Sequence, residues 1–179
     1  MKIIGSKTTD LEKIIQPFDE SILLELVQLA FKCTRDTEGY NLRNEIYKSK
    51  YKATNLENKE LRLEQYLESQ EKVRTKNQNT EYKWIKINTD NMSSISYRFY
   101  IAPNPENLHE LVQRLTETFS KENVPVKFKY QLTSNMEACD RIIIYADYNN
   151  KNLIEQAINR VYLTSPELFD GCERSPAWI

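Results

Sequence analysis

Glycine is scarce in this chain, at 3 of 179 residues. Loops that cradle phosphate groups depend on glycine, because only a backbone without side chains can approach the ligand closely. Neither G-x-x-x-x-G-K-[ST] nor G-x-G-x-x-G occurs anywhere in the sequence. The sequence therefore excludes the glycine-rich nucleotide sites, and any anion must be held by side chains.

Metal-ligating residues are also few. The cysteines, Cys33, Cys139 and Cys172, are widely spaced without a C-x-x-C pair, and His109 is the single histidine. Zinc sites and disulfide frameworks both need closer or paired spacings. We expect no metal, no cofactor and no disulfide, with thiols in a reducing compartment. The side chain of His109 falls beside an apolar helix stripe, so we predict a surface residue rather than a catalytic one.

Long apolar runs and an excess of charge of one sign are missing as well. The longest apolar run, residues 22–31, contains Glu25 and Gln28 and is too short to span a bilayer. The sequence has no signal-peptide pattern, which predicts a cytoplasmic protein with no membrane contact, although secretion by a signal-less route stays open. Lys+Arg 25 against Asp+Glu 26 gives a net charge of −1, so we expect no nucleic acid partner.

The first half of the chain has helical periodicity. Helices are predicted over residues 19–31, 38–52 and 56–74, followed by a polar loop at 75–80. We divide the chain into a helical N-terminal part, 1–80, and a sheet-containing part, 81–179, within one compact domain overall.

The second half switches to the period of a β-strand. Strands are predicted over 82–88, 95–102, 126–132 and 141–147, with helices over 105–121 and 151–162. Asn104 and Pro105 form a helix start, since asparagine caps and proline suits the first turn. The order β-β-α-β-β-α predicts an α+β fold with a four-stranded, mixed or mainly antiparallel sheet covered on one face by helices.

The stretch SISYRFYIAPNP, residues 94–105, poses the functional question. Ile95, Tyr97, Phe99 and Ile101 form an apolar face, and Arg98 with Tyr100 lies on the other. By the same alternation the second face of the sheet carries Arg98, Tyr100, Lys127, Lys129, Arg141 and Tyr145. Cations gathered in this way repel one another unless an anion or a carboxylate lies among them. Two interpretations follow: a solvated face balanced by the acidic N-terminal helices, or an anion-binding site.

The run YRFYIAPNPENLHELVQRL, with NVPVKFKYQL and CDRIIIYAD, resembles the HopA-type effector domain family. An upstream segment, LRNEIYKSKYKATNLEN, is similar to that family's tyrosine-containing stretch, so the likeness covers residues 42–163. The family's glycine-rich segment is absent, and its C-terminal tail is reduced to GCERSPAWI. The resemblance implies either a type III effector delivered into a host cell or a lanthipeptide-pathway protein that eliminates phosphate from phosphoserine or phosphothreonine. It also implies anion contacts by Arg98, Lys129 and Arg141, with Tyr100 and Tyr145 beside them.

Two functions are therefore expected. The first is a phospho-Ser/Thr lyase acting without metal, in which Lys129 or Lys127 is the base, Tyr100 the acid, and Arg98 with Arg141 holds phosphate. The second is a non-catalytic effector or binding module. In both, the partner is a phosphorylated or acidic peptide or protein.

Overall fold

The computed structural model describes residues 51, 56–70, 82–89, 95–133 and 140–173. The predicted helices over 19–31 and 38–52 lie outside these residues, apart from Tyr51, and so does the predicted loop at 75–80. Cys33 and Cys139 also lie outside them. The first described helix, α4 (Glu57–Ser69), falls within the predicted range 56–74.

The four predicted strands are present and form one sheet. They are β1 (Tyr82–Ile87), β2 (Tyr97–Ile101), β3 (Val126–Gln131) and β4 (Ile142–Ala146). The strand order is β1-β3-β4-β2, and all three pairings are antiparallel. The predicted α+β class and the four-stranded antiparallel sheet are therefore confirmed.

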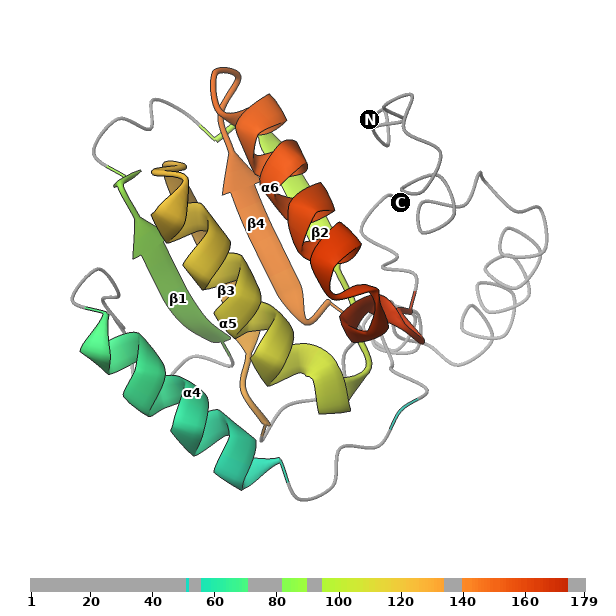
Figure 1. The fold of residues 1–179 in the computed structure, drawn as a ribbon. Coiled ribbons are helices and arrows are strands. Elements are labelled where there is room, and N and C mark those ends of the chain that lie inside the picture. The colour runs from blue at the N-terminus through green and yellow to red at the C-terminus, as the bar shows by residue number, and fades with distance from the viewer. Residues whose placement is uncertain (1–50, 52–55, 71–81, 90–94, 134–139, 174–179) are drawn as a thin grey trace, which may run out of the picture.

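Two long helices cover one face of this sheet (Figure 1). They are α5 (Pro105–Lys121) and α6 (Lys151–Thr164), and they contact each other along the layer. The helix α5 begins as predicted: the Asn104 side chain accepts a hydrogen bond from the Glu106 amide at 3.1 Å, and Pro105 occupies the first turn. A short 3-10 helix, η3 (Pro166–Phe169), was not predicted.

The core lies between the sheet and the helices. Strand residues such as Ile85, Phe128 and Ile144 meet Leu111 and Leu115 of α5, and all are fully buried. The helix α4 packs against α5 and adds Leu63 and Leu67 to the same cluster. The other face of the sheet therefore points away from α5 and α6.

Two predictions about burial are wrong. His109 is only 4% exposed, not a surface residue, because α4 packs along this flank of α5 and the Thr133 hydroxyl lies 3.4 Å from the His109 Nε2. Ile95 is 48% exposed although it was predicted on the apolar face. The strand begins only at Tyr97, so Ile95 lies before the alternation starts.

None of the helices in the described part of the chain is long and apolar enough to cross a membrane.

Candidate anion-binding sheet face

The strand register decides which side chains meet on the face away from the helices. Lys86 of β1 lies opposite Lys127 of β3, which lies opposite Tyr145 of β4, which in turn lies opposite Arg98 of β2. We call this set the first row. Directly opposite residues share a face, so the predicted convergence of Arg98, Lys127 and Tyr145 follows from the pairing.

The second row lies two residues along each strand. It consists of Trp84, Lys129, Ile143 and Tyr100, again in consecutive cross-strand pairs. The two rows together form what we call the sheet-face cluster. It contains five of the six residues that the sequence analysis selected, the exception being Arg141.

A stacked aromatic pair lies at the centre of the cluster. The rings of Trp84 and Tyr145 have centroids 5.4 Å apart and planes inclined by 23°. The Nζ of Lys127 lies 4.7 Å from the Trp84 ring centre, and the Nζ of Lys129 lies 5.4 Å from it. The guanidinium of Arg98 lies 5.6 Å from the Tyr145 ring centre. Each such contact contributes about 0.5–1 kcal/mol at an exposed site, so the rings hold three cations in defined positions.

Two tyrosines adjust the electrostatics around Arg98. A hydrogen bond to the Tyr100 side chain is the main reason why the pKa of Arg98 is raised above its usual value. Burial raises the pKa of the Tyr145 phenol, and the nearby Arg98 charge opposes that shift. The Tyr145 phenol is therefore protonated at neutral pH, and Arg98 stays charged.

The first row concentrates positive charge from three strands, with Lys86 on β1, Lys127 on β3 and Arg98 on β2. Lys86 and Lys127 are like charges in directly opposite positions, an arrangement that destabilises an antiparallel pair. Among the described residues, no carboxylate forms an ion pair with Lys86, Lys127 or Arg98. The acidic α4 does not supply one there: its Glu64 binds Lys83, whose side chain lies on the opposite face of β1.

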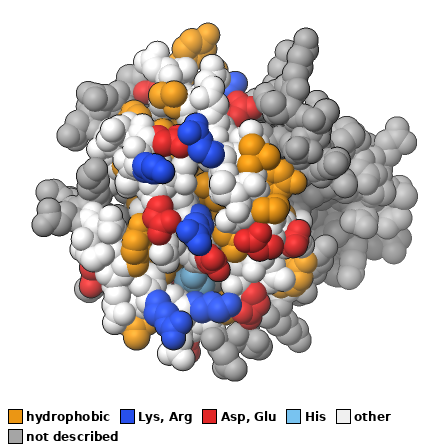
Figure 2. Space-filling view, viewed as in Figure 1, with side chains coloured by type: hydrophobic (Ala, Val, Ile, Leu, Met, Phe, Trp, Pro, Cys, Tyr) orange, Lys and Arg blue, Asp and Glu red, His pale blue; other side chains and the backbone are white. Residues whose placement is uncertain are grey.

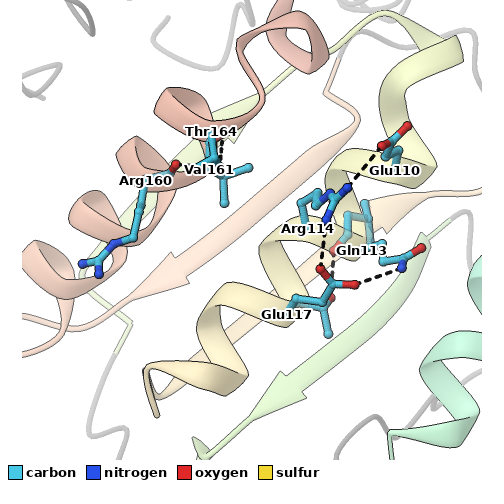
Figure 3. Close-up of polar contacts among 9 residues, drawn as sticks. Glu110, Gln113, Arg114, Glu117, Arg160, Val161 and Thr164 are labelled. Atoms are coloured by element: carbon cyan, nitrogen blue, oxygen red, sulfur yellow. Dashed lines mark hydrogen bonds and ion pairs between the residues drawn. The ribbon is translucent and has the colours of Figure 1, made fainter.

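The helix side of the molecule shows the opposite arrangement. Cations and carboxylates are intermixed over that surface (Figure 2). Arg114 lies 3.8 Å from Glu110 and 3.5 Å from Glu117 (Figure 3), and Arg160 lies 3.0 Å from Glu122. Arg114 and Arg160 on the helix side are therefore paired with carboxylates, in contrast to Arg98 of the first row.

Arg141 lies at the start of β4 and is fully buried. One Nη donates to the Pro103 carbonyl at 2.8 Å, and the other lies 2.7 Å from a Glu173 carboxylate oxygen. The Glu173 amide donates to the Ala102 carbonyl at 2.8 Å, so the ion pair fixes residues 171–173 beside the end of β2. An external anion could contact Arg141 only by displacing Glu173.

Two of the three cluster members that sequence reasoning did not select, Trp84 and Lys86, lie on β1. A signal was present, because both side chains alternate with Ile85 and Ile87 and so share the face of Lys127. What the sequence could not supply was the position of β1 beside β3, which brings Lys86 opposite Lys127.

Metal and thiol chemistry find no support in the described part of the chain. No group of three or more His, Cys, Asp or Glu residues there is placed to hold a metal ion. Cys172 is a free thiol, and burial raises its pKa to about 12, so it is a poor nucleophile.

No protein-family model, curated protein or solved structure matches this chain. The resemblance to HopA-type effectors therefore stays a prediction.

Proposed function

We propose that the sheet-face cluster binds a phosphorylated segment of a peptide or protein. The observation that carries the proposal is the first row, in which Lys86, Lys127 and Arg98 gather without a carboxylate partner among the described residues. A bound anion relieves the repulsion between the two lysines. Phosphate suits this row because its two charges match several cations and because arginine binds it through two parallel hydrogen bonds.

A peptide fits the cluster better than a nucleic acid does. Proteins that bind single strands without sequence preference present open aromatic faces for base stacking and a strongly basic groove. Here Trp84 and Tyr145 stack on each other and carry cations on their rings, and the whole chain has a net charge of −1. The excess of positive charge is local to the sheet-face cluster, which suits the binding of one phosphorylated side chain of a partner.

Elimination of phosphate is a second candidate function, favoured by the contact between Arg98 and Tyr100. In this reaction a lysine, Lys129 or Lys127, removes the α-proton of phosphoserine, and that electron pair forms the Cα–Cβ double bond. The bond from Cβ to the phosphate oxygen breaks, and Tyr100 donates a proton to the leaving phosphate, which Arg98 binds. The ring contacts of both lysines favour an ammonium that binds an anion over an amine that accepts a proton, so we place recognition first.

The test is a titration with a phosphoserine peptide and its serine twin. A charge-assisted contact contributes about 1.5–3 kcal/mol, so Arg98→Ala and Lys127→Gln should each weaken phosphopeptide binding about tenfold or more. Arg98→Lys should recover only part of the loss, since the lysine lacks the fork. Arg114→Ala is the matched control, because this arginine lies on the helix side, and its binding should equal that of wild type.

Equal affinity of the wild type for the two peptides would refute the proposal. Mass spectrometry of the bound phosphopeptide separates the two functions. Intact phosphate supports recognition alone. Loss of phosphate that disappears in Lys129→Gln, with binding retained, supports the lyase.

A further inference from the structure

We propose that the preferred ligand is an extended peptide in which a phosphorylated residue and an acidic residue are two positions apart. This inference rests on the proposed function and adds the spacing and the chemical character of the second contact. It depends on how charge is distributed between the two rows of the sheet-face cluster.

The spacing comes from β3. Lys127 and Lys129 are alternate residues of one strand and point to the same face. Alternate residues of a strand are about 6.4–6.8 Å apart along its axis. Side chains at positions i and i+2 of an extended peptide have the same repeat, so a peptide aligned with β3 places one side chain over each lysine.

The distribution of charge differs between the rows. The first row holds Lys86, Lys127 and Arg98, whereas Lys129 is the single cation of the second row, among Trp84, Ile143 and Tyr100. A dianionic phosphate is therefore best placed over the first row. A singly charged carboxylate matches Lys129, whose Nζ lies between two rings, 4.1 Å from the centre of Tyr82 and 5.4 Å from that of Trp84.

The alternative direction makes a different prediction. A peptide that crosses the strands would place its anions along one row, between Lys127 on β3 and Arg98 on β2, which are separated by β4. Two strand spacings amount to about 9.5 Å, which is close to three residues of an extended chain. The position of the preferred acidic residue therefore reports the direction of binding.

The experiment uses a series of fluorescent phosphoserine peptides in a neutral background. Each carries a single glutamate at one position from −3 to +3, and each is titrated into the full chain by anisotropy. An exposed ion pair contributes up to about 1 kcal/mol, so glutamate at +2 or −2 should strengthen binding by about two- to fivefold over the other positions. Lys129→Gln should abolish that preference while phosphate dependence remains. Lys127→Gln should weaken all peptides alike, and Lys121→Gln, at the exposed end of α5, should change nothing.

Several outcomes would overturn this inference. A preference at +3 or −3, a preference that survives Lys129→Gln, or tighter binding of a single-stranded oligonucleotide each contradicts it. In the first two cases phosphopeptide binding persists, so the proposed function stands. If no phosphopeptide binds more tightly than its serine twin, the proposed function falls and this inference falls with it.

Discussion

Removal of the Arg141 side chain should destabilise the packing of the C-terminal residues rather than weaken an anion site. The Arg141 side chain is 0% exposed and the Glu173 side chain is 7% exposed. The Arg141 Nη2 lies 2.7 Å from the Glu173 Oε2. Arg141→Ala leaves the Glu173 carboxylate buried without its cation and the Pro103 carbonyl without its donor. Breaking one side of a buried ion pair typically costs about 3–5 kcal/mol.

The magnitude can be measured by urea unfolding at pH 7 and by calorimetry. For a chain of this size 1 kcal/mol corresponds to about 2–4 °C in Tm, so Arg141→Ala should lower Tm by about 6–20 °C. The double variant Arg141→Met/Glu173→Leu should recover most of that loss, because a buried ion pair can often be replaced by apolar side chains at little cost. Arg114→Ala is again the control, and as an exposed arginine it should change stability by about 1 kcal/mol or less.

One result would refute this assignment of Arg141. If Arg141→Ala kept the stability of the wild type while phosphopeptide affinity fell tenfold, Glu173 would be a displaceable occupant and Arg141 an anion-binding residue. That outcome would restore the role that the sequence analysis gave to Arg141.

Three further predictions test other parts of the fold. Burial lowers the pKa of His109 below its usual 6.5, so the stability that neutral His109 contributes should be fully present above about pH 6.5 and lost as pH falls through the folded-state pKa. His109→Gln should therefore flatten the pH dependence of the free energy of unfolding between pH 7 and 5, and an unchanged slope would contradict the burial. Gly171 has a φ of 67°, and a Cβ there would lie 2.8 Å from the Tyr51 hydroxyl oxygen. Gly171→Ala should lower the free energy of unfolding in urea by about 1 kcal/mol or more. The double variant Gly171→Ala/Tyr51→Phe should recover part of that stability, and no recovery would leave backbone strain as the whole cause. Leu115→Ala should cost about 2–5 kcal/mol because the side chain is fully buried, whereas Leu163→Ala, 61% exposed, should stay within about 0.5 kcal/mol; similar losses for the two would contradict the core assignment.

Local sequence signals predicted the elements well because their causes are local. The alternation in YRFYI and VKFKYQ defines strands by period alone, and the Asn104-Pro105 start needs only a cap and a fixed φ. These signals hold wherever the segment is placed. They also decided correctly which residues of β2 and β3 leave the helix-covered face.

Features that depend on packing between distant segments could not be predicted in this way. The burial of His109 depends on α4, a helix about 40 residues earlier whose position beside α5 has no signature in the sequence. The contribution of Lys86 depends on the strand order β1-β3-β4-β2, which places non-consecutive strands side by side. Periodicity assigns a side chain to a face, but it does not assign a neighbour.

The two arginines of the second face make the difference concrete. Arg98 and Arg141 have the same side chain, and alternation assigns both to the face away from the helices. Arg98 is exposed over the Tyr145 ring, without a described carboxylate partner, so it can exchange water for an anion at little cost. Arg141 already binds a carboxylate 32 residues further along the chain, in a site that excludes water. Because desolvation makes the second pairing costly to open, only Arg98 has the environment of a recognition residue, and substitutions at the two positions should separate binding from stability.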